Sequence, residues 1–448
     1  MNKSWAIFLI LFSSLSYFHA SDKIPLEKAI TDGIRISYEF KNNLLNEQTA
    51  ELQRQRSAKQ KLFHLNFNAN YLFRSETMVI DTPSFYIPGM GTLAGQQIEA
   101  GLKHNYDMKL SAVQPLFTGG ILSNTLKTDE IRKAVEANRS KLKQNEIAAR
   151  IKTSFFNYLY LIHKKESLAA LQKSLNLHHR KLKNLFREGL VKKSDILETL
   201  SRFEELNLNI EDIEQAIENE RIHFRNLCSY NPDEIDKSYT EKTGSRDESL
   251  SYFKHHHPVL KTLQSQIEIL TLKQKILAGK YLPQVNSFAE IHYGKPGIDF
   301  FKKEWSFYFQ GGITLNLPVF DWSRLKGDKK VLDIQIRKLD NQQKDIIKEA
   351  SKNLEQLFAA RETIKNKLTN IEQLIDYSKE DAELKAGLYQ EKQIPNIDLL
   401  TALSYAEKYP LMKQELLIQL EQVKVKINTL ISLNYSRGEV AVDARRRR

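Results

Sequence analysis

The chain has 448 residues and 67 Lys and Arg against 55 Asp and Glu, which gives a formal net charge of +12 at pH 7. Lys and Glu alternate along helical stretches, and four of the positive charges are the terminal Arg445 to Arg448. The charge therefore indicates solvated helix faces, not a nucleic-acid-binding surface. The single cysteine, Cys228, excludes an intrachain disulfide and is predicted to be a small buried apolar residue.

The amino terminus has the pattern of an export signal. A short polar start leads into the apolar run Trp5 to Phe12 and then into small and polar residues that end at Ala20. This pattern predicts a signal peptide over residues 1–20. No later segment approaches the roughly 18 to 20 apolar residues that a membrane-spanning helix needs. We therefore expect an exported chain that is periplasmic, secreted or part of a β-barrel.

Strict alternation of apolar and polar residues predicts the first strands. Leu65, Phe67, Ala69, Tyr71 and Phe73 fall on one face of residues 64–73, and polar residues fall on the other. The same alternation predicts strands at about 64–75 and 104–115, and again at about 284–294 and 305–317. Each has the length of roughly 9 to 11 residues that a tilted transmembrane strand requires.

A sheet in a soluble sandwich would show the same alternation, but the context favours a membrane. Only four strands are predicted, and no other part of the chain is expected to supply a sheet. The segments 74–104 and 294–304 are expected to be surface loops at the outer end. Membrane barrels need about eight or more strands and tolerate no unpaired edge in lipid, so several chains must share one barrel.

Helical spacing follows the second strand and persists without proline to about residue 187. A helix over about 120–187 would be about 100 Å long and would need packing partners along its course. A tight turn at 188–194 leads into a returning helix at about 195–228, whose Phe203, Leu206, Ile210 and Ile213 have coiled-coil spacing. Asp195 opens this helix, where a carboxylate can cap free amide groups.

The second half of the chain repeats the first. Residues 115–117 and 186–197 recur 203 positions later, whereas upstream residues recur 220 positions later. We therefore predict two copies of one unit, at 21–235 and 257–435, joined by a linker at 236–256 and followed by a basic tail at 436–448. The second copy should have long helices at about 322–390 and 398–433. Pro410 predicts a kink or break in the last of these.

Three local motifs carry a family resemblance. The segment 114–120 reads Gln-Pro-Leu-Phe-Thr-Gly-Gly, 317–322 reads Leu-Pro-Val-Phe-Asp-Trp, and His-Pro-Val-Leu begins at residue 257. The two strand-to-helix turns are thus marked by Pro115, Gly119, Gly120 and Pro318. With the signal peptide and the two copies, these motifs resemble the TolC family of outer membrane efflux channels over about residues 24–435.

The resemblance implies both an architecture and partners. The protein would be mainly α-helical and would form a homotrimer, with four strands from each chain in a twelve-stranded outer membrane β-barrel that continues into a helical periplasmic tunnel. A periplasmic adaptor (membrane fusion) protein and an inner-membrane transporter of the RND, ABC or MFS type would complete an efflux pump or a type I secretion system. The chain would be a passive exit duct in contact with outer membrane lipid.

The resemblance also implies a gate at the periplasmic mouth, closed by the second-copy helical hairpin. Tyr389 matches a gate tyrosine of the family, Asp398 matches a carboxylate of the constricting ring, and Asp195 matches a carboxylate that accepts a gate arginine. Ile394 stands where that arginine is expected, and Thr401 stands where a second acidic residue is expected.

The turn that joins the second-copy helices also departs from the family pattern. Lys392 replaces the usual turn glycine, which the first copy retains as Gly189. We expect one ring of three Asp398 carboxylates, with Lys392 or a neighbouring Lys in place of the missing cation. The hairpin ends at Gly189 and Leu190, with Lys392 and Gln393, resemble the adaptor-docking tip.

Two other classes of protein share part of this pattern. A trimeric autotransporter adhesin also joins a twelve-stranded barrel to coiled coil, but its strands lie together at the carboxyl end, whereas the pairs predicted here are flanked by helices. An enzyme would need a catalytic or metal site. His255 to His257 are adjacent and point in different directions, and no phosphate loop or nucleophile elbow is present. We therefore expect no metal, cofactor or catalytic residue.

Overall fold

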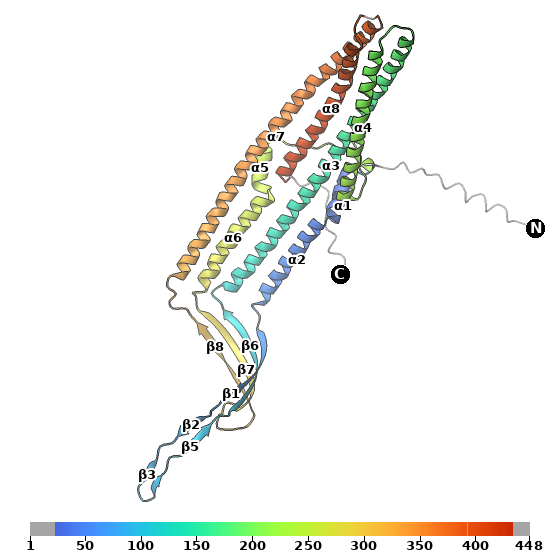
Figure 1. The fold of residues 1–448 in the computed structure, drawn as a ribbon. Coiled ribbons are helices and arrows are strands. Elements are labelled where there is room, and N and C mark those ends of the chain that lie inside the picture. Colours follow the sequence, from blue (N-terminus) through green and yellow to red (C-terminus); the bar gives the residue numbers. More distant parts are fainter. Residues whose placement is uncertain (1–22, 392, 433–448) are drawn as a thin grey trace, which may run out of the picture. The chain divides into compact units, whose positions relative to one another are not determined.

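The computed structural model describes residues 23–391 and 393–432, so the predicted signal peptide, Lys392 and the basic tail lie outside the described residues. No helix in the described part is both long and apolar enough to cross a membrane. The helices are α1 Leu26–Ile36, α2 Tyr38–Lys59, α3 Ile121–Arg187, α4 Lys193–Cys228, α5 Arg246–His256, α6 Pro258–Gly279, α7 Arg324–Gln390 and α8 Asn396–Leu430 (Figure 1).

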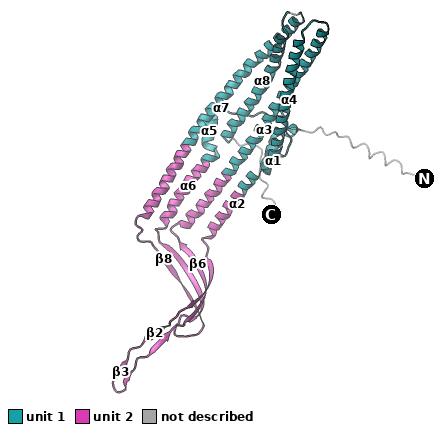
Figure 2. Ribbon diagram, in the orientation of Figure 1, with its two compact units in different colours: residues 1–44, 139–260, 345–448 teal, residues 45–138, 261–344 magenta. Residues whose placement is uncertain are grey.

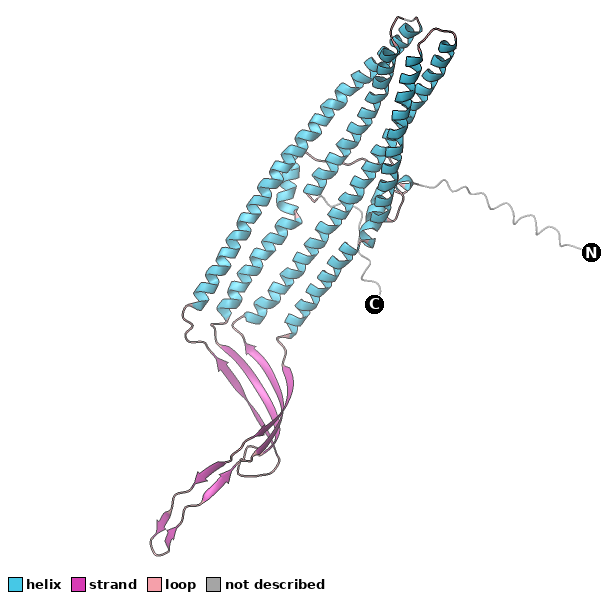
Figure 3. Cartoon of the chain, in the orientation of Figure 1, coloured by secondary structure: helices cyan, strands magenta, loops and turns pink. Residues whose placement is uncertain are grey.

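The strands fall into one main sheet and a separate group of short strands (Figure 3). The main strands are β1 His64–Phe73, β6 His104–Phe117, β7 Gln284–Lys295 and β8 Ser306–Asn316. A short 3-10 turn also occurs at Pro232–Glu234.

The internal repeat extends through the helices. The helices α5 and α6 begin 220 residues after α1 and α2, and α7 and α8 begin 203 residues after α3 and α4. The predicted mainly helical chain with two repeated units is confirmed. The stretch 236–256, predicted to be a linker, however contains α5. Its start is a capping box in which the Ser245 hydroxyl accepts the Glu248 N–H and the Glu248 carboxylate accepts the Ser245 N–H.

The chain divides into two compact units, 1–44 with 139–260 and 345–448, and 45–138 with 261–344 (Figure 2). The second unit contains the four-stranded antiparallel sheet, in the order β1-β6-β7-β8. The two copies of the repeat therefore meet at the β6–β7 pair. Among the described residues no further strand pairs with the outer edges of β1 and β8.

The strand register gives this sheet one apolar and one polar face. Phe67 lies opposite Leu110, Leu110 opposite Ile291, and Ile291 opposite Phe309, which forms an apolar row across all four strands. On the polar face, Glu290 forms an ion pair with Lys109 at 3.1 Å and accepts a hydrogen bond from Gln310 at 2.6 Å. On the same face, His292 Nδ1 lies 2.9 Å from Asp107 Oδ1. The alternation read from the sequence therefore predicts both faces correctly.

The prediction that residues 74–104 form a loop without a sheet is wrong. Two small antiparallel pairs occupy this segment: β2 Met78–Asp81 with β5 Gln97–Ala100, and β3 Phe85–Ile87 with β4 Gly91–Leu93. Strands of three or four residues are too short for a period of two to be recognised among Gly and Pro.

The first unit is held by an apolar core that joins α1, α3 and α4. Ile151, Phe155, Phe224 and Cys228 are 0% exposed and pack with Leu26. The Cys228 thiol donates to the Phe224 carbonyl at 3.3 Å, and burial raises the pKa of Cys228 to about 11. The cysteine is therefore a buried neutral side chain, as predicted.

Helix α8 includes Pro410 and continues without interruption from Asn396 to Leu430, so of the predicted kink or break the break is absent. A proline inside a helix costs about 3 kcal/mol because it removes one hydrogen bond and crowds the preceding turn. Leu416 of α8 is 4% exposed and packs against Ile364 and Ile371 of α7, with Tyr409 at the edge of the same cluster. This packing on both sides of Pro410 offsets the local cost.

The strand-to-helix turns explain one of the glycines in the motif at 114–120. Gly119 and Gly120 have φ of +60° and +79°, and their repeat equivalents Trp322 and Ser323 have φ of +54° and +63°. Left-handed backbone therefore occurs here with and without glycine. Gly119 has a second constraint, because an added Cβ would overlap the Gly279 carbonyl oxygen and lie 2.9 Å from Leu282 Cβ.

The other two turn residues lie at the strand ends. Pro115 lies inside β6 next to an irregularity in the β6–β7 register, and Pro318 follows β8 outside any helix or strand.

Replacing Gly119 by Ala should lower the free energy of unfolding by more than about 2 kcal/mol, since left-handed backbone costs about 1–2 kcal/mol and overpacking adds about 1–3 kcal/mol. Gly120→Ala is the matched control, because its nearest neighbour would be Asn124 Nδ2 at 3.5 Å. Gly120→Ala should lose only the stability that left-handed backbone costs, about 1–2 kcal/mol. Denaturant unfolding followed by circular dichroism in detergent measures both, and equal losses would contradict the close-approach argument.

Candidate functional site

The predicted site residues lie at the ends of two helical hairpins, α3–α4 and α7–α8. In the first turn the Leu190 N–H donates to the Leu185 carbonyl at 2.8 Å, and in the second the Gln393 N–H donates to the Leu388 carbonyl at 2.9 Å. These bonds are repeat equivalents, so the two turns share this backbone closure. Gly189 has φ of +75°, and Leu190 is 41% exposed. Lys392, which is the repeat equivalent of Gly189, lies outside the described residues.

A buried polar side chain connects the two hairpins. Asn396, at the start of α8, is 3% exposed, and its Oδ1 lies 2.6 Å from Nε2 of His178 on α3. Its Nδ2 donates to three oxygens of α4: the Asp195 carbonyl at 3.5 Å, Glu198 Oε2 at 3.3 Å and Thr199 Oγ1 at 3.4 Å. We call His178, Asn396, Asp195, Glu198 and Thr199 the inter-hairpin cluster.

The bonding pattern assigns the proton on His178. Because Nδ2 of Asn396 donates to oxygens, Oδ1 must accept, and His178 Nε2 therefore carries a hydrogen. His178 is 7% exposed. Burial lowers its pKa, the Asn396 bond opposes this shift, and the nearby Lys181 and His179 lower the pKa further. The imidazole is therefore neutral in this arrangement at pH 7.

Tyr389 packs against this cluster from α7. Its ring meets the His178 ring edge-on, with the centroids 5.6 Å apart. The hydroxyl is buried and has no hydrogen-bond partner among the described residues. Burial raises the pKa of Tyr389, and the negative charge of Asp195 raises it further. The phenol is therefore neutral.

Asp195 has a capping role at the start of α4. Its Oδ2 accepts the Lys192 N–H at 3.2 Å, and Ser194 Oγ donates to its Oδ1 at 3.4 Å. The carboxylate thus satisfies a backbone donor at the helix start, while the carbonyl of the same residue accepts from Asn396. Asp195 both caps α4 and belongs to the contact between the hairpins.

The remaining predicted gate residues lie apart from the cluster. Asp398 is exposed, and none of its side-chain atoms is hydrogen-bonded or ion-paired to another described residue. Thr401 is exposed and donates its hydroxyl to the Ile397 carbonyl of its own helix at 2.7 Å. Ile394 is half-buried in the turn. The structure therefore unites Asp195 and Tyr389 and leaves Asp398 on the surface of the chain.

The sequence analysis missed His178 and Asn396. Their repeat equivalents are Asp381 and Lys193, so the repeat does not mark them. One local signal was available for Asn396, because Leu399 and Leu400 follow it at helical spacing on the same buried face. A polar residue on such a face needs a partner, but nothing local names His178 as that partner.

Comparisons with known proteins give a fold. No family model and no curated protein sequence matches the chain. Among solved structures, it is similar to CusC, a protein studied for transmembrane channel formation, with a TM-score of 0.73 and 11% identity over 92% of this chain and 93% of that one. It is also similar to the outer membrane protein VceC of Vibrio cholerae, with a TM-score of 0.72 and 13% identity over 91% and 96% of the two chains.

The CmeC outer membrane channel of Campylobacter jejuni gives a third match, with a TM-score of 0.71 and 14% identity over 92% of this chain and 86% of that one. These matches span nearly the full length of both partners in each comparison. The chain has the fold of these outer membrane channels.

Proposed function

We propose that this protein is the outer membrane exit duct of a tripartite efflux pump or a type I secretion system. The observation that carries the proposal is the four-stranded sheet, which has one apolar face, one polar face and two unpaired edges. Such a sheet is not stable in lipid by itself, because the N–H and C=O groups of its edge strands would lack hydrogen-bond partners. The shared fold with outer membrane channels supports the same conclusion.

A homotrimer completes the sheet. If β8 of each chain pairs with β1 of the next, three chains give twelve strands and no free edge. The apolar face would then contact outer membrane lipid, and the polar face with Lys109, Asp107, Glu290 and His292 would line the water-filled interior. The strand pairs lie between helices, which disfavours the adhesin alternative. An export signal would deliver the chain to this location.

The helices would extend the conduit into the periplasm, with the hairpin ends towards the other pump components. The exposed Leu190 and Gln393 are the proposed contacts for a periplasmic adaptor, together with Gly189 and Lys392. The inner-membrane transporter of the RND, ABC or MFS type would supply the energy, because the duct itself conducts passively and performs no catalytic step.

Two features of the hairpin ends would control the opening. The inter-hairpin cluster holds α8 against α3 and α4 within each chain. Asp398 has no partner among the described residues of its own chain and remains available to the other two chains of a trimer. Three such carboxylates around one axis would attract cations and repel one another.

The test is the conductance of the purified trimer in planar lipid bilayers. Wild-type protein should conduct and should be blocked from the periplasmic side by hexaamminecobalt(III). Asp398→Ala should raise the conductance and weaken the block more than about fivefold, because a unit charge about 4 Å away contributes about 1 kcal/mol even in bulk water. Asp212→Ala is the matched control, since Asp212 is an exposed acid on α4.

The outcomes separate the duct from the gate. A wild-type protein that purifies as a monomer and never conducts would refute the proposed function. Conductance and block that are the same in wild type and Asp398→Ala would remove Asp398 from the gate and leave the duct in place.

A further inference from the structure

The helix ends next to the sheet have many unpaired lysines. Six lysines, which we call the basic collar, lie near these helix ends: Lys59 and Lys61 at and just after the end of α2, Lys273 and Lys280 near the end of α6, and Lys329 and Lys330 near the start of α7. All six are exposed, and none has a carboxylate oxygen within 4.0 Å among the described residues. By contrast, Arg54, Lys133 and Arg132 nearby are used in ion pairs with Glu51 and Asp129.

The collar belongs to one continuous row of helices within a single compact unit (Figure 2). Ser57 of α2 donates to Asp129 of α3. The turn before α3 touches the end of α6 through Gly119 and Gly279, and Gln274 of α6 donates to Asp333 of α7 at 2.7 Å. The order α2, α3, α6, α7 is that of the strands β1, β6, β7 and β8.

Exposed apolar side chains separate the collar from the strands. Phe63 is 61% exposed, Phe320 is 73% and Trp322 is 86%. Along the chain, the paths between β1 and α2 and between β8 and α7 therefore pass an apolar strand face, an aromatic junction and then lysines. A membrane has the same order of layers, from hydrocarbon through the interface that Trp prefers to the phosphate groups.

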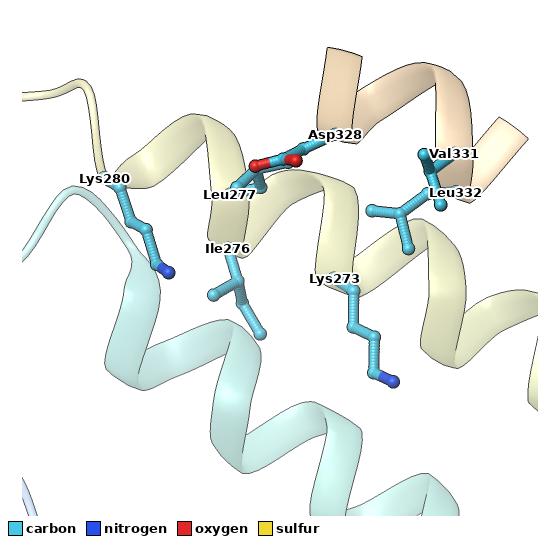
Figure 4. A pocket seen from close by; sticks show the side chains of 7 residues that line it. All are labelled: Lys273, Ile276, Leu277, Lys280, Asp328, Val331 and Leu332. Carbon is cyan, nitrogen blue, oxygen red and sulfur yellow. The ribbon is translucent and has the colours of Figure 1, made fainter. Parts of the chain in front are cut away.

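A shallow groove between α6 and α7 adds a specific seat. It has a volume of about 330 Å³ and is lined by the side chains of Lys273, Ile276, Leu277, Lys280, Asp328, Val331 and Leu332. Figure 4 shows both ammonium groups on the same side of α6, away from the Asp328 carboxylate. An apolar lining beside two ammonium groups suits a phosphate with the start of an acyl chain attached.

We propose that the basic collar binds the phosphate groups of anionic phospholipids in the leaflet next to the helices, with one lipid seated in the α6–α7 groove. This inference rests on the proposed function, because it requires the sheet to lie in a membrane. Positive side chains at a membrane surface attract anionic headgroups, and salt screens this attraction. The collar would therefore anchor the height of the channel in the bilayer and depend on ionic strength.

The test uses Trp322 as a local reporter. The protein without residues 1–20, which include Trp5, and with Trp305→Phe is placed in nanodiscs of dioleoyl phosphatidylcholine that contain a minor fraction of brominated phosphatidylglycerol or brominated phosphatidylcholine. Quenching by the brominated phosphatidylglycerol should be at least about threefold stronger, since each surface lysine favours anionic lipid. The preference should fall in 0.5 M NaCl, a concentration at which the Debye length is about 4 Å.

A collar variant and a matched control locate the effect. Glutamine at Lys273, Lys280, Lys329 and Lys330 should abolish the preference, whereas glutamine at the exposed Lys237, Lys348, Lys367 and Lys379 should leave it unchanged. Equal quenching by the two lipids in the parent protein, or a preference that survives in the collar variant, would overturn the inference.

Bilayer conductance of the same preparations separates this failure from a failure of the proposed function. If the protein conducts but shows no lipid preference, only the collar inference is refuted. An acidic protein partner would then become the candidate for this surface. If the protein does not conduct at all, the proposed function is refuted, and so is the collar inference that depends on it.

Discussion

Replacing Glu241 by Ala is expected to lower the free energy of unfolding by about 3–5 kcal/mol, because it removes the main counter-charge of a buried ammonium group. Lys152 Nζ lies 2.7 Å from Glu241 Oε2, and the two side chains are 1% and 4% exposed. Burial lowers the pKa of Lys152, and the charge of Glu241 opposes that shift. The weaker attraction of Glu27 and the Tyr239 ring, whose centroid lies 5.0 Å from Lys152 Nζ, would replace only part of the lost interaction.

Glu241 also collects hydrogen bonds from several elements of the first unit. Asn428 Nδ2 donates to Oε1 at 2.6 Å, and Tyr239 Oη donates to Oε2 at 2.6 Å. The Glu241 N–H donates to Glu421 Oε2 at 2.7 Å. The segment predicted to be a linker is therefore attached to α3 and α8 through one buried carboxylate, so its loss should be felt by both copies of the repeat.

Thermal or denaturant unfolding in detergent measures the effect, with an exposed ion pair as the control. Lys413 Nζ lies 2.8 Å from Glu372 Oε1, but these side chains are 35% and 62% exposed. Glu372→Ala should therefore cost less than about 1 kcal/mol. The double variant Lys152→Met with Glu241→Gln should recover most of the stability that Glu241→Ala loses, since no charge is then buried. If Glu241→Ala lowered the free energy of unfolding as little as Glu372→Ala does, the prediction for the buried ion pair would be wrong.

Replacing Asn396 by Ala is expected to raise the resting conductance of the channel in planar bilayers. The change leaves the His178 Nε2–H buried without an acceptor and removes the bonds from α8 to Thr199 and Glu198. An unsatisfied buried donor costs about 1–3 kcal/mol, so the arrangement in which α8 is bonded to α3 and α4 should lose roughly 5- to 150-fold in population for each chain. On the proposed function, separation of the hairpins would widen the duct. The Thr369→Ala variant is the control, because that hydroxyl is exposed and bonds its own helix.

The same cluster predicts a dependence on pH. Burial holds the pKa of His178 below its usual value of 6.5, so the arrangement with the inter-hairpin cluster formed binds fewer protons than one in which the hairpins separate. Its stability is fully present above pH 6.5 and is lost as the pH falls through that value towards the lowered pKa. Conductance should therefore rise between pH 7.5 and about pH 5 in wild type.

The groups around His178 allow this effect to be assigned. Lys181 and His179 lie on its own helix, Asp195 and Glu198 on α4, and Tyr389 on α7. Burial raises the pKa of Tyr389 above the usual value of a phenol, which is about 10, so this group does not titrate in this window. His178→Gln should abolish most of the rise, whereas His179→Gln should retain it. A rise that is unchanged in His178→Gln would assign the pH dependence to another group.

The amphipathic sheet and the long helices were predictable because their signals are local. The alternation from Leu65 to Phe73 fixes which face of β1 is apolar, since successive side chains of a strand point to opposite sides. The offset of 203 residues carries α3 and α4 onto α7 and α8 without reference to their partners. The start of α5 also had a local signal in Ser245 and Glu248, but it was overlooked in a stretch assigned to a linker.

The contact between the hairpins could not be read in the same way. His178 and Asn396 are 218 positions apart, and no periodicity links a histidine on one helix to an amide on another. The same holds for Lys152 and Glu241, which are 89 positions apart. The sequence alone determined the elements, the apolar faces and the internal repeat, because each depends on neighbours within a few residues. The tertiary structure decided which polar groups are buried together, because that choice depends on how helices pack and on which donors lose their water.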